Sequence, residues 1–480
     1  MKIVANLVGG EHRPARSGAT LEDLSPATGH TIATIPASDA DDVNDAVTAA
    51  RTAMAGPWAG WTTQDRADLC DRIADRIEAR MDELAALESE DTGKPLTTAR
   101  NMDIPRAVAN FRFFAGAVRH DETGCHEMAN AINYTIRRPL GVVGLITPWN
   151  LPLYLLSWKT APALACGNVI VAKPSELTPL TAAALGEIVT EAGAPPGVFN
   201  LVHGTGPSAG QALVDHRDVA AISFTGGTAT GARVGATAAA SFKKLSLELG
   251  GKNASVVFAD CDFDHTIRET VRASFTNQGQ VCLCGSRILV ERSIHDRFVA
   301  AFVKRVEALR LGDPSDPATE LGALISLAHR DKVESYVDIA RSEGGTIATG
   351  GSRPELPGHL SGGAFYRPTV ITGLAPTCRV ATEEIFGPVV TIHPFDTAEE
   401  AVAVANSVRY GLSATVWTRD LQRAHRVSAA LDCGMVWVNT WLRRDLRVPF
   451  GGVKDSGIGR EGGRHSLEFY THDKNICIAL

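Results

Sequence analysis

Three side chains have the types needed for covalent chemistry on a carbonyl group. Cys282 stands in "SFTNQGQVCLCGSR" after a polar, glycine-bearing turn, where N–H dipoles or a cationic ligand can lower the pKa of a thiol. Glu248 lies in the otherwise apolar run "LSLELGGKN", where a carboxylate is costly unless it acts, for example, as a general base. Asn150, in "TPWN", offers an amide donor to a developing oxyanion. A lone cysteine is more often a small buried hydrophobe, so the combination of the three predicts a nucleophilic thiol.

Two further segments have residue types that can hold a nucleotide. "SFTGGTATG", with Gly226, Gly227 and Gly231, follows an apolar strand and precedes a helix, the context in which backbone N–H groups approach phosphate. A tight turn without a ligand explains these glycines about as well. "VAKPSE" places Lys173 and Glu176 at a strand end, where they can bracket the hydroxyls of a ribose or form an ordinary surface ion pair.

The elements that must position these residues follow the pattern of an α/β protein. Helical periodicity dominates the first third, and from Gly141 short apolar strands alternate with helices, as in a parallel sheet covered on both faces. A second series of candidate strands follows Asp260. The uncharged stretch at 139–158 is long enough to imitate a membrane span. Pro148 and Pro152 near its centre favour instead a buried strand, a loop and a helix.

Composition and charge exclude several classes of partner. The chain has 480 residues, enough to bury a deep site, and its net charge of −7 comes without a long run of like charge. We therefore expect no nucleic-acid and no membrane partner. The nine cysteines have no CxxC or zinc-type spacing, and the N-terminus lacks the apolar region of a secretory signal. These features predict free thiols, no metal site and a cytoplasmic location.

Seven motifs occur in the order and at the spacing of one known family. They are "TPWNLPL", "AKPSE", "FTGGTATG", "LELGGKN", "NQGQVC", "EEIFGPV" and "PFGGVKDSGIGREGG", and with them the chain resembles the aldehyde dehydrogenase superfamily nearly end to end. The resemblance implies that Cys282 adds to the aldehyde, while Asn150 and the Cys282 backbone N–H hold the oxyanion. Hydride then passes to nicotinamide, and Glu248 activates the water that hydrolyses the thioester. The motif also favours Cys282 over Cys284, which we expect to line the pocket.

The resemblance further implies an NAD site. An acidic residue at Glu176 repels a 2′-phosphate, which favours NAD over NADP. Many relatives have Gly-Ser in the phosphate turn, but this chain has Gly226 and Gly227, so backbone N–H groups must act there without a hydroxyl. Glu384 is expected on the nicotinamide ribose, with Phe386 near the nicotinamide. The expected cofactor-binding residues are Trp149, Lys173, Glu176, Gly226, Gly227, Gly231, Gly250, Glu384 and Phe386.

The stretch "NTWLRRDLRVPFGG" resembles the subfamily that includes 2-hydroxymuconate- and 2-aminomuconate-semialdehyde dehydrogenases, whose substrates carry a carboxylate opposite the aldehyde. Arginine is the residue that recognises a carboxylate in a bidentate way. By this resemblance Arg444 points into the substrate channel, with Arg112 of "NFRFFAG" as its partner. Arg443 and Arg447 are interpreted as structural. For Arg444 the alternative is an ion pair with nearby Asp445 or another acidic residue.

The expected substrate is therefore a small anionic semialdehyde of the 2-hydroxymuconate-6-semialdehyde type, oxidised to the dicarboxylic acid. Two alternatives stay open. One is a dehydrogenase of a neutral aliphatic, aromatic or betaine-type aldehyde, and the other is a non-catalytic binding or structural protein on the same fold.

The predicted organisation is a Rossmann-type NAD domain, an α/β catalytic domain and a small β oligomerisation element. Strand-like segments remote from both sheets pair between subunits in the superfamily, which implies a homodimer or a homotetramer. The predicted ranges are 1–118 and 140–249 for the NAD domain, 250–448 for the catalytic domain, 449–463 for a return segment, and 119–139 and 464–480 for the oligomerisation element.

Overall fold

The computed structural model describes residues 1–480, and its larger sheet has the strand order β22-β12-β11-β8-β9-β10-β2-β3. The strands from β12 to β10 are parallel, whereas β22, β2 and β3 pair antiparallel at the two ends. Every residue of β8 and β9 is buried, as expected for strands of a sheet that is covered on both faces. The strands are β2 (Asn6–Val8), β3 (Glu11–Arg13), β8 (Val142–Ile146), β9 (Val169–Lys173), β10 (Phe199–Leu201), β11 (Val219–Thr225), β12 (Lys244–Glu248) and β22 (Gly457–Ile458).

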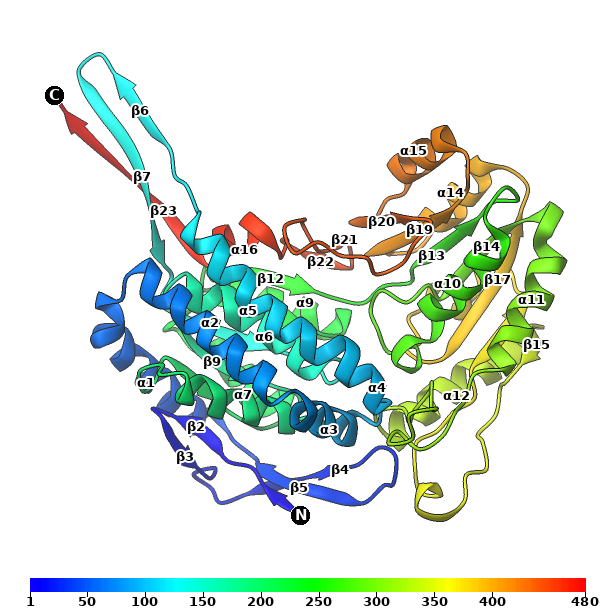
Figure 1. The fold of residues 1–480 in the computed structure, drawn as a ribbon, viewed down its shortest axis with the longest axis horizontal. Helices are drawn as coiled ribbons and strands as arrows, with labels where there is room; N and C mark the ends of the chain where they lie inside the picture. The colour runs from blue at the N-terminus through cyan, green and yellow to red at the C-terminus, as the bar shows by residue number, and fades with distance from the viewer.

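Helices pack around this sheet and form the left-hand body in Figure 1. Asp39 caps the first helix and Thr62 the second, each in a capping box with the acidic residue three positions later. The helices are α1 (Ala40–Ala55), α2 (Thr63–Ala79), α3 (Met81–Thr92), α4 (Leu96–Thr98), α5 (Ile104–Arg119), α6 (Pro152–Ala165), α7 (Leu180–Glu191), α8 (Gln211–Asp215) and α9 (Thr228–Ala239).

The second sheet lies in the right-hand body of Figure 1 and has the order β15-β16-β17-β14-β13-β19-β20. Its strands are parallel except β15. They are β13 (Ala254–Val257), β14 (Arg287–Glu291), β15 (Thr346–Thr349), β16 (Thr369–Thr372), β17 (Val389–Phe395), β19 (Ser413–Trp417) and β20 (Met435–Val438). The accompanying helices are α10 (Phe263–Phe275), α11 (His295–Glu307), α12 (Leu327–Ser342), α13 (Arg379–Thr382), α14 (Ala398–Asn406) and α15 (Leu421–Ala430).

A three-stranded antiparallel arm projects from the first body at the upper left of Figure 1. It consists of β6 (Cys125–Met128), β7 (Ala131–Pro139) and β23 (Thr471–Ala479), with β7 in the middle. The C-terminal segment was expected to be strand material throughout, but its first part is a helix, α16 (Gly463–Phe469), which packs on α5 and α6. Smaller sheets contain β1 (Lys2–Ile3), β4 (Thr20–Leu24) and β5 (Thr31–Pro36), and β18 (Tyr410–Gly411) and β21 (Val453–Lys454).

The prediction for the apolar stretch at 139–158 is confirmed, because it contains β8, a loop and the start of α6. No helix in the structure has both the length and the apolar character needed to cross a membrane. The two large sheets fall in different parts of the chain, with the short strand β22 returning from the C-terminal region to the first sheet. The functional roles given to the predicted domain ranges stay a prediction.

Candidate active site

The carboxyl ends of four neighbouring strands meet at one edge of the larger sheet. Glu248 ends β12 and Lys173 ends β9, and between them in the sheet lie β11 and β8. Gly226 directly follows β11, and Asn150 lies in the loop after β8. Ligands of open parallel sheets bind beyond this edge, so the topology brings together residues that are distant in sequence.

A cavity of about 310 Å³ lies beside this edge and reaches Cys282. The predicted site residues among its walls are Trp149, Asn150, Gly226, Gly227, Gly250, Cys282, Glu384 and Phe386. The walls also include His329 and Lys332 of α12, which no motif had marked. These two residues reach the cavity only because of the way α12 packs in the folded chain, and local sequence does not predict that packing.

Cys282 follows a turn in an unusual backbone conformation. Asn277, Gln278 and Gly279 are left-handed in succession, with φ of 53°, 56° and 72°. The two non-glycine residues are strained there and need compensating contacts. The Asn277 amide donates to the Asn150 carbonyl at 3.0 Å, and the Gln278 amide donates to a main-chain carbonyl at 2.8 Å. The turn is therefore held against the Asn150 loop.

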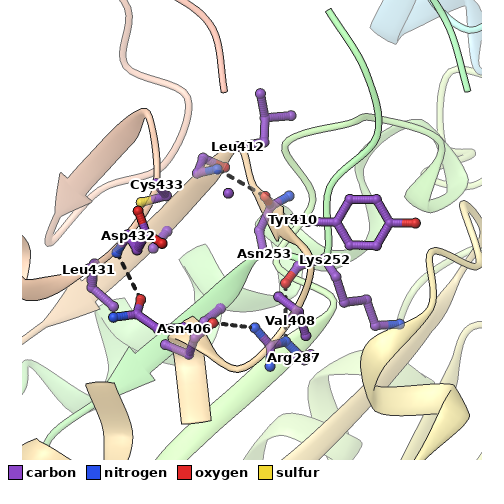
Figure 2. A pocket seen from close by; sticks show the side chains of 15 residues that line it. Lys252, Asn253, Arg287, Asn406, Val408, Tyr410, Leu412, Leu431, Asp432 and Cys433 are labelled. Atoms are coloured by element: carbon purple, nitrogen blue, oxygen red, sulfur yellow. Dashed lines mark hydrogen bonds between the residues drawn. The ribbon is translucent and has the colours of Figure 1, made fainter. Parts of the chain in front are cut away.

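Asn253 holds the main chain directly after the thiol. Its Nδ2 donates to the carbonyls of Cys282 and Cys284 at 2.7 and 2.9 Å, and its Oδ1 accepts from the N–H of Ser413 at 3.1 Å. Figure 2 shows Asn253 and the buried Arg287 beside a second cavity. That cavity measures only about 20 Å³, room for about one water molecule, so it is too small for a substrate.

The surroundings of Cys282 disfavour its thiolate form. Burial, followed by the carboxylates of Glu248 and Glu384, raises the pKa of the Cys282 thiol well above its ordinary value, with partial opposition from Arg444. The expectation of a lowered pKa is therefore wrong for the protein by itself. Burial also raises the pKa of the neighbouring Cys284 thiol to about 12.

We expect Cys282 of the protein alone to react slowly with iodoacetamide near neutral pH and faster as the pH rises past about 9, because the thiolate is the reactive form. Mass spectrometry of the alkylated peptides over a pH series measures the rate. Cys125 and Cys477 are exposed and serve as references in the same sample. If the alkylation rate of Cys282 reaches its plateau at a lower pH than the rates of Cys125 and Cys477 do, the raised pKa is contradicted.

Asn150 and Cys282 together offer donors to an oxyanion. The carbonyl of Asn150 accepts from Lys94 Nζ and from the Asn277 amide, both at 3.0 Å. Asn150 Nδ2 donates one hydrogen to the Gln280 carbonyl at 2.8 Å, which leaves its second hydrogen for a ligand. The backbone N–H of Cys282 donates to no carbonyl of the main chain. Two such donors near one thiol are the arrangement of an oxyanion hole.

Glu248 is buried at the end of β12, and its Oε1 has no hydrogen-bond partner. Burial, and then the Glu461 carboxylate, raises the pKa of Glu248 well above its ordinary value, while Lys159 opposes this. Lys159 Nζ fixes Glu461 nearby, since it donates to Glu461 Oε1 and to Ser223 Oγ, each at 2.8 Å. A carboxyl with a raised pKa is suited to proton transfer near neutral pH.

The predicted ribose-binding pair exists as an ion pair. Lys173 Nζ lies 3.1 Å from Glu176 Oε2, with Lys173 buried and Glu176 half-buried. Burial lowers the pKa of Lys173, and Glu176 partly offsets the effect. An ordinary surface ion pair does not bury its lysine, so the observed Lys173–Glu176 pair differs from the surface ion pair that was the alternative.

The glycine turn after β11 leaves room for a phosphate. Helix α9 begins at Thr228 directly after Gly227, and no side chain caps its first N–H groups. A Cβ built on Gly227 meets nothing within 4 Å, so the space beside it is open. An open helix start with free N–H groups fits the pyrophosphate of a dinucleotide. Gly231 differs, because a Cβ there would overlap the Leu249 side chain, so this glycine permits packing of α9 on the sheet.

Glu384 and two aromatic residues form the other end of the cavity. Glu384 Oε1 accepts from the N–H of Gly251 at 2.9 Å, and a Cβ on Gly250 would overlap the same carboxylate. Burial raises the pKa of Glu384. Phe386, at φ 61°, stacks edge to face on Trp149 with ring centres 5.3 Å apart. Two aromatic side chains and a carboxylate therefore line this end of the cavity, residue types that suit a nicotinamide and its ribose.

Arg444 extends over an aromatic surface beside the thiol. Its guanidinium lies 3.9 Å from the ring centre of Phe450 and 5.3 Å from that of Trp158, and its Nη1 donates to the Tyr154 hydroxyl at 3.0 Å. Tyr154 and Phe450 belong to the apolar cluster that packs against Cys282. Arg444 therefore lies on the aromatic cluster next to Cys282, although it does not line the 310 Å³ cavity.

The other acids and arginines of this loop do not engage Arg444. Asp445 forms its ion pair with Arg447 at 2.6 Å, and Arg444 makes no ion pair with an acidic residue. The structure thus excludes the alternative in which Asp445 neutralises Arg444. Arg443 and Arg447 are exposed, in line with a structural role.

The expected partnership between Arg112 and Arg444 is wrong. Arg112 lies on the outer face of α5, where its guanidinium is exposed and pairs with Asp75, at 3.0 Å, and with Glu78 of α2. The face of α5 that reaches the site carries Arg106 instead. Arg112 does not line the cavity and pairs only with these surface carboxylates, a kind of ion pair that contributes little to stability.

Arg106 is the arginine that accompanies Arg444. Its guanidinium lies 5.3 Å from the ring centre of Tyr154 and 5.4 Å from that of Trp158, the two residues that also contact Arg444. Arg106 Nε donates to Asn110 at 3.0 Å, while its buried Nη2 has no partner. Burial lowers the pKa of Arg106 to about 10, and Arg444 adds to that effect. Two guanidinium groups without an acidic partner create a site for an anion.

A family model described as "Aldehyde dehydrogenase family" matches residues 12–476, and the chain belongs to this family. Among its relatives, 2-hydroxymuconic semialdehyde dehydrogenase of Pseudomonas sp. (strain CF600) is 53% identical, with 100% of both chains covered. The 2-aminomuconic semialdehyde dehydrogenase of Homo sapiens is 48% identical over 99% of this chain and 98% of its own. Betaine aldehyde dehydrogenase from Staphylococcus aureus, solved with NAD⁺, has a TM-score of 0.96 and is 40% identical over 98% of this chain and 94% of its own.

Proposed function

We propose that the enzyme oxidises a carboxylate-bearing semialdehyde of the 2-hydroxymuconate type to the dicarboxylic acid, with NAD as the oxidant. The observation that carries the substrate class is the pair Arg106 and Arg444, which have no acidic partner and share Tyr154 and Trp158. Two relatives that are 53% and 49% identical to this chain are named for muconic semialdehydes, which agrees with this proposal.

The proposed reaction begins when the Cys282 thiol loses its proton to solvent water and the thiolate attacks the aldehyde carbon, which forms the C–S bond of a thiohemiacetal. The negative charge that develops on oxygen is stabilised by the free hydrogen of Asn150 Nδ2 and by the Cys282 N–H. Because both donors are already fixed by the turn and its hydrogen bonds, they need little reorganisation as charge develops.

When bound, NAD supplies the acceptor for the hydride that leaves the thiohemiacetal carbon. The Lys173–Glu176 pair is proposed to contact the adenosine ribose, and the open helix start after Gly227 the phosphates. Gly226 lines the same cavity, but its N–H already donates to the Glu248 carbonyl at 3.0 Å. Glu384 is proposed to hold the second ribose, between Phe386 and the Gly250 segment. Trp149 lies beside Phe386 at the same end of the cavity.

The thioester left on Cys282 is then hydrolysed. Glu248 accepts a proton from the attacking water, and its raised pKa matches that role. Glu248 passes this proton to the departing Cys282 sulfur, and the new carboxylic acid loses its own proton to solvent. The dicarboxylate product carries the new carboxylate at the end opposite the one held by the arginines.

A neutral or betaine-type substrate is the alternative within the family, and a solved relative is named for betaine aldehyde. Two unpaired guanidinium groups repel a cationic substrate, which disfavours the betaine type. A neutral aldehyde leaves both cations without a partner. A non-catalytic role is disfavoured because Cys282, Glu248 and Asn150 are all present at one edge.

The test compares kcat/KM for a carboxylate-bearing semialdehyde and for a neutral analogue of similar length. Arg444→Ala should lose about 2 to 3 kcal/mol of this discrimination, the scale of a charge-assisted contact. Arg106→Ala should lose a similar amount, whereas Arg443→Ala, an exposed neighbour on the same loop, should keep wild-type discrimination. Unchanged selectivity in both Arg444→Ala and Arg106→Ala excludes the anionic substrate and leaves aldehyde oxidation in place.

We also propose that the enzyme is a cytoplasmic homodimer or homotetramer. The projecting arm supports self-association, because β6 and β23 both end the sheet with an unpaired edge. Exposed edges of this kind are usually covered, and a second copy of the arm is a suitable cover.

A further inference from the structure

A buried ion cluster lies directly behind the Asn150 loop. The side chains of Lys94, Glu88 and Asp103 have no exposed surface. Lys94 Nζ donates to Asp103 Oδ2 and lies 3.8 Å from Glu88 Oε1. Burying charges is costly even when they are paired, so such a cluster often adds nothing to stability compared with apolar residues. Its contacts indicate what else it does.

The cluster forms hydrogen bonds with the Asn150 loop and with the start of the helix that follows it. Lys94 Nζ donates to the Asn150 carbonyl at 3.0 Å. Glu88 Oε2 accepts from the N–H of Leu153 at 3.4 Å, at the start of α6. Lys94 does not line the cavity, so it reaches the site only through Asn150.

The position of Lys94 is fixed by the turn before it. Gly93 ends α3 in the left-handed conformation, at φ 71°, and its carbonyl accepts from the N–H of Ala323 at 2.9 Å. The Ala323 carbonyl in turn accepts from the Gln278 amide at 2.8 Å. One continuous set of hydrogen bonds therefore joins the Lys94 turn, the Cys282 turn and the Asn150 loop.

We propose that Lys94 is a positioning residue for the oxyanion donor. Its ammonium, held by Asp103 and Glu88, fixes the Asn150 carbonyl and with it the direction of the Asn150 side-chain amide. This inference rests on the proposed role of Asn150 in the reaction. The Asn277 amide contacts the same carbonyl, so Lys94 and Asn277 hold it from two sides.

A double-mutant cycle tests the proposal, because residues that act through one group have non-additive effects. Asn150→Ala alone should lower kcat by about 100- to 1000-fold, as for loss of an oxyanion donor. Lys94→Met should lower kcat by about 10- to 100-fold in the wild-type background, with little change in KM for NAD. In the Asn150→Ala background, Lys94→Met should lower kcat less than about threefold.

A second variant addresses folding, since Lys94→Met leaves two buried carboxyl groups without their cation. Lys94→Met with Asp103→Leu replaces the ion pair by apolar groups of similar size, which often preserves stability. This double variant should show the same non-additive effect on kcat when it is combined with Asn150→Ala. Thr181→Val is the matched control, because Thr181 Oγ1 donates to Glu88 at 2.6 Å but does not contact Asn150. It should affect thermal unfolding without lowering kcat more than about threefold.

The possible failures are distinguishable. Equal losses from Lys94→Met with and without Asn150 overturn the positioning role and leave the proposed reaction intact. A wild-type kcat in Asn150→Ala overturns the oxyanion assignment and, with it, this inference.

Discussion

Cys282→Ala should abolish aldehyde oxidation, with kcat lower by at least about 10⁴-fold, the scale seen when a covalent nucleophile is removed. In the proposed reaction the thiol forms the bond that makes hydride departure possible, and no other thiol lines the cavity with Asn150. NADH absorbance during steady-state turnover measures the loss. Binding of NAD should be retained, because the proposed nucleotide contacts do not include the sulfur.

Cys284→Ala is the matched control for that experiment. Cys284 is buried and has its main-chain carbonyl fixed by Asn253. Its removal should cost stability through a small cavity but leave kcat within about tenfold of wild type. Full NADH production by Cys282→Ala, or loss of activity only in Cys284→Ala, assigns the nucleophile to the other cysteine.

Glu248→Gln should separate the two halves of the reaction. The first turnover should still produce NADH, whereas steady-state turnover should fall by about 10²- to 10⁴-fold, because thioester hydrolysis loses its general base. Stopped-flow absorbance should therefore show a burst of about one NADH per site followed by a slow phase. Absence of the burst contradicts a role confined to hydrolysis.

The pH dependence of the slow phase gives an independent check. Burial and Glu461 raise the pKa of Glu248, so its proton is retained to higher pH than in an ordinary glutamate. The protonated carboxyl cannot accept a proton, and wild-type hydrolysis should decline as the pH falls through the raised pKa. Glu248→Gln should lack this decline. A wild-type profile that stays flat down to about pH 5 is incompatible with the raised pKa.

Sequence patterns predicted residues at strand ends better than residues on helix faces. Asn150, Gly226 and Glu248 each end or follow an apolar strand, and parallel pairing alone brings such positions to one edge. Arg112 and Arg106 share one helix, and only the packing of α5 against α2 and α6 decides which of them faces inward. The motif resemblance pointed to Arg444, which the structure places on the aromatic cluster next to Cys282, but the expected partner Arg112 lies elsewhere.

The sequence patterns also did not predict electrostatic effects between segments that are distant in sequence. The pKa of Cys282 depends on its burial and on carboxylates from two other segments, so a polar turn alone gave the wrong sign. Lys94 and Lys159 follow ordinary local patterns, and their roles emerge only from contacts across the fold. Both lysines are buried, which composition does not reveal.

The return of β22 to the first sheet has a consequence for the timing of synthesis. Glu461, which shapes the surroundings of Glu248, is 302 positions after its partner Lys159. At about 5 to 20 residues per second, a ribosome needs about 15 to 60 s to cover that interval. The strands β9 to β12 are made during this interval, and from the end of β12 until β22 follows the nascent chain holds the parallel strands of the first sheet without the segment that closes its β12 edge. The surroundings of Glu248 are therefore complete only once Glu461 has been made, and a product truncated before Glu461 carries the thiol without them.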